Sequence, residues 1–230
     1  MRIGLIFAMD IEKQAFLQQF KHHTVKPLDA FEGFLIEPKG HQLMGVLCGV
    51  GKVQAAYTTT RLLERYDLDL IINVGVAGGL ALQPQSILVA DEVVYHDVDL
   101  SAFNYEHGAL PQQTTPFKAD TQLLERVRTL DATGPFDVHI GMLASGDQFV
   151  TQKETLKGIL SRFPQVEAVD MEAAAIAHVA TLKKTPFFIV RAISDTLGSE
   201  AQTHDFKTFV EKASIQAAKL VVKVVGLDAD

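Results

Sequence analysis

The sequence predicts an α/β fold with a largely parallel central sheet. Short, continuous apolar runs at residues 3–7 and 70–74 have the composition of strands that are buried on both faces. Segments with strand character alternate with helical segments along the whole chain, which is the pattern of a parallel sheet covered by helices. No internal repeat, low-complexity tract or linker interrupts this pattern. We therefore expect a single domain over residues 1–230.

Each expected element follows from its local pattern. The expected strands are short apolar runs, at residues 3–7, 34–36, 43–47, 70–74, 87–90, 93–95, 138–144, 166–169 and 187–192. The expected helices are the longer segments between them, at residues 10–20, 52–66, 123–130, 153–163, 172–182 and 206–225. Residues 97–118 show no clear period and carry aromatic residues and prolines. A loop of this length inside a compact domain is usually functional.

Composition limits the class of partner. With 47% hydrophobic residues the chain can bury a sizeable core, and its net charge of −7 comes without a basic patch, so we expect no nucleic-acid partner. No apolar stretch reaches the ~20 residues of a membrane span. The single cysteine, Cys48, lies in a strand-like run and is expected to be a structural thiol in a reducing compartment. We expect a cytoplasmic protein that does not bind membranes.

Polar residues gather where the predicted strands end. Glu12 follows the first strand, Glu172 opens a helix after the strand at 166–169, and Arg191 and Asp195 lie at the end of the strand at 187–192. In open α/β sheets, ligands bind at the carboxyl ends of strands. Three carboxylates with an arginine among them indicate cleavage of a polar, sugar-like molecule rather than a binding scaffold.

Each of these residues also has a purely structural interpretation. Glu172, in the first turn of a helix, should stay ionised and accept hydrogen bonds from sugar hydroxyls, but it could simply cap the helix. Asp195 could share a proton with a bound base, with Ser194 helping to hold it, or could form an Asx turn. Arg191 lies in an apolar strand and needs an acidic partner, which could be structural.

Two glycine-rich segments and three weak metal candidates are the other notable features of the sequence. The segments at 49–52 and 75–79 match neither a P-loop nor a dinucleotide fingerprint, so they mark either tight turns with positive φ or close approach to a ligand. His96, Asp97 and Asp99 are weak metal candidates without a second histidine motif. We expect no metal and no cofactor.

Taken together, the motifs resemble those of the bacterial 5′-methylthioadenosine/S-adenosylhomocysteine nucleosidase family. The resemblance covers nearly the whole chain and rests on these segments in this order: Ala8-Met9-Asp10-Ile11-Glu12, Gly49-Val50-Gly51-Lys52, Ile71-Ile72-Asn73-Val74-Gly75-Val76-Ala77-Gly78-Gly79, Tyr95-His96-Asp97-Val98-Asp99, Ser145-Gly146-Asp147, Val169-Asp170-Met171-Glu172-Ala173 and Arg191-Ala192-Ile193-Ser194-Asp195. It implies the fold of the nucleoside phosphorylases, a three-layer α/β/α sandwich with a mixed, largely parallel central sheet. It also implies a homodimer.

The resemblance further implies hydrolysis of an N-glycosidic bond, which releases adenine and a thioribose. Glu12 then activates water, Asp195 protonates adenine N7, and Arg191 lies near the water and Glu172. The implied substrate contacts fall into four groups. They are Met9, Val76, Asp170, Met171 and Glu172 around the ribose and water, Phe149, Val150 and Ser194 around adenine, Val50 and Phe206 in the 5′-alkylthio pocket, and Leu100, Phe103 and Pro111 supplied by the partner subunit.

This chain departs from the family pattern at two site positions. The family usually has serine at the position of Val76 and glutamate at the position of Asp170. Three other functions stay open at this point: a phosphorylase of the same superfamily, another hydrolase such as a futalosine hydrolase, and a non-catalytic nucleoside-binding protein.

Overall fold

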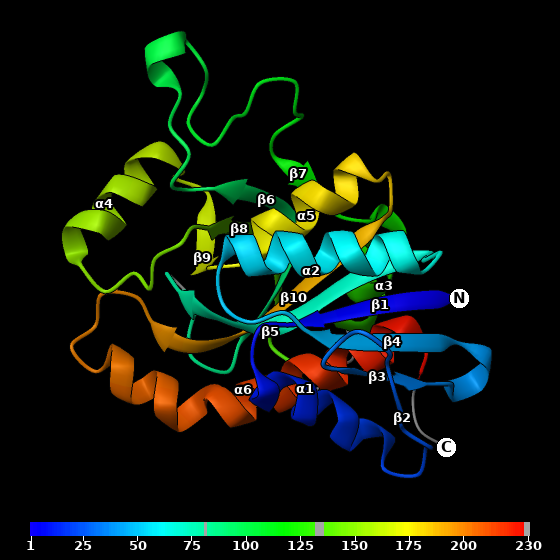
Figure 1. Cartoon of the computed structure of the whole chain (residues 1–230). Helices are drawn as coiled ribbons and strands as arrows, with labels where there is room; N and C mark the ends of the chain where they lie inside the picture. Colours follow the sequence, from blue (N-terminus) through cyan, green and yellow to red (C-terminus); the bar gives the residue numbers. More distant parts are fainter. Residues whose placement is uncertain (81, 132–135, 228–230) are drawn as a thin grey trace.

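The computed structural model describes residues 1–80, 82–131 and 136–227. In it, helices cover both faces of one mixed sheet, so the expected three-layer α/β/α architecture is confirmed. Helices α2 (Lys52–Arg65) and α5 (Ala173–Leu182) pack against each other on one face, and α1 (Asp10–Leu17) and α6 (Gln202–Val225) pack against each other on the other (Figure 1).

The remaining elements complete the sheet and its cover. The strands are β1 (Arg2–Phe7), β2 (Lys26–Pro27), β3 (Gly33–Ile36), β4 (Gln42–Leu47), β5 (Leu70–Gly79), β6 (Ile87–Tyr95), β7 (Phe117–Lys118), β8 (Val138–Ser145), β9 (Val166–Asp170) and β10 (Phe187–Thr196). The other helices are α3 (Thr121–Asp131), α4 (Lys153–Arg162) and the short 3-10 turns η1 (Gln18–Phe20), η2 (Pro38–Gly40) and η3 (Ser101–Phe103).

The sheet closes on itself at one end. Strand β5 runs parallel to β1 and β10, β10 pairs antiparallel with β6, β6 and β8 are parallel, and β9 joins β8 to the end of β5. Five strands therefore form a ring, and β1, β4, β3 and β2 extend it as an open sheet. Closure brings the carboxyl ends of β5, β9 and β10 around one space.

Two strands are longer than their sequence predicts, and this corrects one interpretation. The segment at 75–79 continues β5 instead of ending it, and Ser194 and Asp195 lie within β10. None of the glycines in that segment has a positive φ, so the tight-turn interpretation is wrong there. It is correct at 49–51, because Gly49 and Gly51 have φ values of 86° and 97°.

Apolar side chains fill both interfaces between sheet and helices. The main core takes its largest aromatic side chains from Phe7, Phe16, Phe117 and Phe188, all almost inaccessible to solvent. A second cluster lies beneath α4. In the part of the chain that the structure describes, no helix is long and apolar enough to cross a membrane.

Candidate active site

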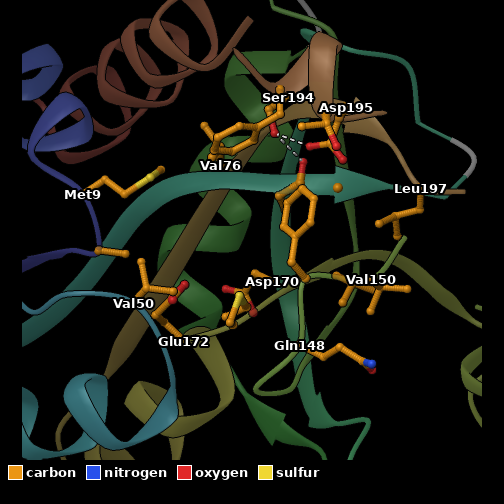
Figure 2. Close-up of a pocket in the computed structure, with 18 of the residues that line it drawn as sticks. Met9, Val50, Val76, Gln148, Val150, Asp170, Glu172, Ser194, Asp195 and Leu197 are labelled. Atoms are coloured by element: carbon orange, nitrogen blue, oxygen red, sulfur yellow. Dashed lines mark hydrogen bonds between the residues drawn. The ribbon is translucent and has the colours of Figure 1, made fainter. Parts of the chain in front are cut away.

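A cavity of about 530 Å³ opens at the carboxyl ends of β1, β5, β9 and β10. Figure 2 shows Met9, Val50 and Glu172 on one side of it and Ser194 and Asp195 on another. The sequence-predicted residues that line it are Met9, Glu12, Val50, Val76, Phe149, Val150, Asp170, Met171, Glu172, Ser194, Asp195 and Phe206. The expected convergence at the strand ends is therefore present, and the strands concerned pair both parallel and antiparallel.

Glu12 is held by backbone N–H groups from two separate segments. It lies in the first turn of α1, where its Oε2 accepts hydrogen bonds from the amides of Ala8 and Met9 at 2.9 Å each. Its Oε1 accepts from the amide of Val76 at 3.1 Å. A Cβ atom at Gly75 would lie 2.5 Å from Oε1, so the glycine leaves the space that the carboxylate occupies.

The electrostatics of Glu12 suit a base. The residue is only 3% exposed, and burial raises the pKa of its carboxyl, while Arg191 and the three N–H donors lower it. A carboxylate offers about four acceptor sites, of which three are in use. One site remains for a proton on a water molecule, and the raised pKa favours taking that proton.

Asp195, unlike Glu12, accepts no hydrogen bond from a backbone N–H group among those found in the described residues. The Ser194 hydroxyl donates to its Oδ1 at 2.6 Å, as expected from the sequence, while Oδ2 is buried and has no hydrogen-bond partner among the described residues. Burial raises the pKa of this carboxyl, and the Ser194 hydrogen bond and the nearby Gln202 side chain offset the rise in part. A raised pKa favours the protonated form, which can donate to a ligand atom.

Glu172 differs from what the sequence predicts. It occupies the N-cap position of α5, yet its side chain makes no capping hydrogen bond and instead accepts from the amide of Gly51 at 2.8 Å. Burial, followed by the nearby Asp170 charge, raises its pKa to about 7, so near neutral pH the carboxyl is divided between its ionised and protonated forms and is not fully ionised as expected. The helix dipole is too weak an effect to outweigh removal from water.

The α5 terminus is capped by two other side chains. Asp170 Oδ2 accepts from the amide of Ala173 at 3.1 Å, and Ser145 Oγ accepts from the amide of Ala174 at 2.8 Å. The Ser145 hydroxyl also donates to Asp170 Oδ1. These contacts leave Glu172 free for the cavity, so the capping interpretation of Glu172 is wrong.

Arg191 is buried beneath the cavity and does not line it. Its Nε and Nη2 donate to Asp170 Oδ2 at 3.0 and 2.8 Å, which is the acidic pairing that the sequence predicts. Nη1 donates to the carbonyls of Val190 and Asn73 at 3.0 and 3.4 Å, and Nη2 also donates to Asn73 Oδ1. All five N–H groups of a guanidinium are thereby in use. Arg191 can act on the cavity through its charge but has no donor left for a ligand.

The rest of the cavity is largely apolar. The Phe149 and Phe206 rings meet edge to face, with centroids 5.8 Å apart. Val50 and Phe149 are 54% and 47% exposed, so the cavity is open on this side. Sequence reasoning missed Gln148, Leu197, Thr203 and Lys207, which also line the cavity. Their only signal is proximity in sequence to predicted site residues.

The three loop residues Leu100, Phe103 and Pro111 do not line the cavity of their own chain. They belong to the long loop that leaves the body of the molecule between β6 and β7 (Figure 1). Phe103 is 72% exposed, which is unusual for an aromatic side chain.

Two of the three weak metal candidates have other partners, whereas Nε2 of the third, His96, is buried and has no hydrogen-bond partner among the described residues. Asp97 pairs with Lys52 at 2.6 Å, and Asp99 lies 3.5 Å from His107. Among the residues that the structure describes, no group of three or more His, Cys, Asp or Glu side chains could hold a metal ion. Burial raises the pKa of the Cys48 thiol to about 12, which makes it a poor nucleophile and agrees with a structural role.

Comparison with known proteins places this chain in a family. Residues 2–226 match the model of the phosphorylase superfamily. The 5′-methylthioadenosine/S-adenosylhomocysteine nucleosidase of Aeromonas salmonicida is 35% identical over 229 residues, which is 98% of this chain and 99% of that protein.

Solved structures agree with the sequence comparison. The nucleosidase of Neisseria meningitidis, in complex with methylthio-immucillin-A, has a TM-score of 0.90 at 33% identity, covering 97% of this chain and 98% of that one. The futalosine hydrolase of Helicobacter pylori also has a TM-score of 0.90, at 30% identity, covering 98% and 97% of the two chains. By fold, cavity and near full-length similarity, the chain belongs to the phosphorylase superfamily and, within it, to the 5′-methylthioadenosine/S-adenosylhomocysteine nucleosidases.

Proposed function

We propose that this chain hydrolyses the N-glycosidic bond of 5′-methylthioadenosine and S-adenosylhomocysteine, releasing adenine and the corresponding 5-thioribose product. Its relatives are named for this activity, and the similar structure from Neisseria meningitidis is a complex with methylthio-immucillin-A. The observation that carries the proposal is the pairing, in one cavity, of a carboxylate held by three N–H groups with a carboxyl that keeps one buried oxygen free.

The two carboxyl groups divide the chemistry. As the bond between the sugar carbon and the base nitrogen breaks, its electrons move to adenine, and Asp195 delivers a proton to N7. Glu12 takes a proton from water as the water oxygen bonds to the sugar carbon. Glycoside hydrolysis through an oxocarbenium-like state needs such an acid and such a base, and each proton transfer typically contributes ~10²–10⁴-fold.

The remaining residues bind and orient the substrate. Glu172 and Met171 hold the ribose, the Phe149–Val150 segment lines the adenine slot, and Val50 and Phe206 line the apolar slot for the 5′-thioalkyl group. An apolar slot suits a thioether tail, because burying it costs no hydrogen bonds. Arg191 orders the site through Asp170.

Water is a better nucleophile here than phosphate. A phosphate dianion needs several cationic or hydroxyl donors. Of the described residues that line the cavity, only Lys207 carries a positive charge, and it is exposed, while all the donors of Arg191 are occupied. Val76 also lacks the hydroxyl that the family usually has at this position. These features favour hydrolysis over phosphorolysis.

Futalosine hydrolysis is the second candidate, because one similar structure is a futalosine hydrolase. Such a substrate carries a different group at its 5′ end, so the slot at Val50 and Phe206 would discriminate between the two. Comparing kcat/KM for methylthioadenosine and futalosine on one preparation ranks the candidates directly.

The first experiment incubates the pure protein with 5′-methylthioadenosine, with and without phosphate, and identifies the products. We expect adenine and free methylthioribose at equal rates in both. Phosphate-dependent formation of the sugar 1-phosphate would instead identify a phosphorylase. No release of adenine would favour another hydrolase substrate or a non-catalytic nucleoside-binding protein.

We also propose that the chain is a homodimer in which the loop at residues 100–111 completes the partner's cavity. The support is complementary: Val50 and Phe149 leave the cavity open, and the loop presents Leu100, Phe103 and Pro111 away from its own site. Light scattering coupled to gel filtration measures the mass, and Phe103→Ala should raise KM without changing the fold.

A cytoplasmic location completes the proposal. The support is the unpaired, buried Cys48 thiol, which is compatible with a reducing compartment. Fractionation of the source cells, with adenine release as the assay, tests it.

A further inference from the structure

Three loops at the rim of the cavity are tied together by Lys52, Asp97 and Asp147, which we call the loop clamp. Lys52 opens α2, Asp97 follows β6, and Asp147 follows β8. Lys52 Nζ lies 2.6 Å from Asp97 Oδ2 and 3.8 Å from Asp147 Oδ2. The Asp147 amide donates to Asp97 Oδ2 at 3.0 Å. No residue of the clamp lines the cavity.

The loop clamp binds the Lys52 amide, which directly follows the Gly51 amide that contacts Glu172 in the cavity. Two successive amides bind two different carboxylates: the Gly51 amide donates to Glu172 Oε1 at 2.8 Å, and the Lys52 amide donates to Asp147 Oδ1 at 2.7 Å. Gly51 has a φ of 97°, and a Cβ atom there would lie 3.2 Å from Asp147 Oδ1. The direction of the Gly51 N–H therefore depends on where Asp147 holds the start of α2.

The clamp is electrostatically coherent. Burial alone would raise the pKa of Asp97, but the hydrogen bonds from Lys52 and from the Asp147 amide outweigh it and hold the pKa below its ordinary value. Asp97 is thus ionised at neutral pH and attracts the Lys52 ammonium. Lys52 Nζ also lies over the Tyr95 ring, 5.4 Å from its centre, and this cation–π contact helps to hold the ammonium group in place.

Glu172 depends on the Gly51 amide more than an exposed carboxylate would. The charged or titratable groups around it are Asp170, Glu12, Arg191 and the Cys48 thiol. Asp170 and Glu12 oppose its ionisation, while Arg191 and the Gly51 hydrogen bond favour it. Arg191 is already committed to Asp170, so the Gly51 N–H is the described group that donates to the Glu172 carboxylate.

We propose that Lys52, Asp97 and Asp147 are positioning residues that aim the Gly51 amide at Glu172 and so keep this carboxylate ready to bind the sugar. The inference rests on the proposed function, because it assigns the clamp to the sugar-binding step of the same site. The clamp acts on binding and on the protonation of Glu172, and leaves the acid and the base untouched.

Two variants with opposite charge effects test the clamp. Lys52→Met removes a positive charge, and Asp147→Ala removes a negative one together with the acceptor for the Lys52 amide. If the clamp positions Gly51, both variants raise KM for methylthioadenosine about tenfold with kcat nearly unchanged. Both variants also shift the acid limb of the kcat/KM profile upward by about one pH unit, because the hydrogen bond from the Gly51 amide to the Glu172 carboxylate is lost. If only charge matters, the two limbs shift in opposite directions, and the proposal is wrong.

Matched controls separate positioning from general damage. Lys183→Met breaks a 3.1 Å ion pair with Glu64, which links the C-terminal ends of α2 and α5. The contact between Gly51 and Glu172 lies at the N-terminal ends of these two helices, so this variant should leave KM and the pH profile unchanged. Lys52→Arg keeps the charge and should stay within about threefold of the wild type in KM. A Lys52→Met protein with a wild-type KM and pH profile would overturn the inference.

A readout without turnover keeps the two proposals distinguishable. The protonation of Glu172 can be followed by NMR in protein labelled with ¹³C at the glutamate carboxyls, with the signal assigned by Glu172→Gln. A wild type that releases no adenine would refute the proposed function alone. An unchanged Glu172 titration in both Lys52→Met and Asp147→Ala would refute the clamp alone.

Discussion

Two of the carboxyl groups that line the cavity, Glu12 of α1 and Asp195 of β10, lie against the same strand, β5, but have opposite kinds of hydrogen-bond partner. Gly75 of β5 makes room for Glu12, and Gly78 of β5 lies beside Asp195 Oδ2. At ~3.3 Å per residue, the two contacts are about 10 Å apart along the strand. Glu12 has three N–H donors, whereas Asp195 has one hydroxyl and one oxygen without a partner.

In the proposed mechanism, this difference lets one functional group, the carboxyl, serve two roles in one cavity. N–H donors stabilise a negative carboxylate and fix its orientation, so Glu12 is a preorganised acceptor that needs only a water molecule. A buried oxygen without a hydrogen-bond donor disfavours the charge, which raises the pKa of Asp195 and makes the protonated form, able to donate to a ligand, more accessible. Burial is common to both, and the partners decide the role.

The largest expected effect comes from breaking the base side of this comparison with Glu12→Gln. The amide cannot accept a proton from water, and its NH₂ group would face at least one backbone N–H. We expect kcat to fall by about 10⁴-fold, at the upper end for loss of a general base, while substrate still binds. Single-turnover assays and calorimetric titration measure the two effects. Normal turnover in this variant would remove Glu12 as the base.

Asp195→Asn breaks the acid side. The volume is kept and the Ser194 hydroxyl can still donate, so the fold should be intact by circular dichroism. We expect kcat to fall ~10²–10³-fold, because adenine must leave without a proton from this residue. A near-normal kcat would contradict the role of Asp195 on the leaving group.

Glu172 sharpens the comparison, because it lies between the two extremes with one N–H donor. Its pKa is raised to about 7, so the folded protein holds this proton in a pH range where the unfolded chain has lost it. Stability should therefore fall as pH rises from about 4.5 to about 7, by up to about 3 kcal/mol from this residue. Urea unfolding of wild type and Glu172→Gln at several pH values measures this. The variant should lose that part of the pH dependence, and an unchanged slope would count against the raised pKa.

The smallest expected effect is at Val76, whose amide holds Glu12 but whose side chain offers no hydroxyl. Val76→Ser supplies a donor next to the base, where the family usually has one. We expect kcat/KM to rise by a few fold, with Val76→Ala as a control for the change in volume. A slower serine variant would mean that the cavity has repacked around valine.

Part of this site could be predicted because it depends on local pattern. Apolar runs followed by acids marked the strand ends, and the spacing of the motifs identified the family. The strand lengths were less accessible: β5 and β10 run on through residues 75–79 and 193–196, which lack a continuous bulky apolar pattern. Closure of the sheet follows from those extra residues, because the end of β5 pairs with β9. It could not be derived from strands that were expected to stop earlier.

The partners of each acid were beyond the sequence for a different reason. That Arg191 needs an acid follows from burial, but the choice of Asp170 depends on how closure of the sheet brings the end of β9 to Arg191 of β10, although these two strands are not paired in the described sheet. The raised pKa of Glu172 could not be predicted because burial, a tertiary property, outweighs the local helix dipole.

Gly75 has a consequence for which amino acids this position can accept. Its backbone adopts no conformation reserved for glycine, so the fold itself would accept alanine. The three atoms nearest to the added carbon would all belong to the carboxylate tip of Glu12, a flexible group that can move aside. A protein with alanine at position 75 would therefore still fold, and what it would lose is the base. The amino acids that position 75 can accept are thus limited by the proposed base, Glu12, although Gly75 itself does not line the cavity.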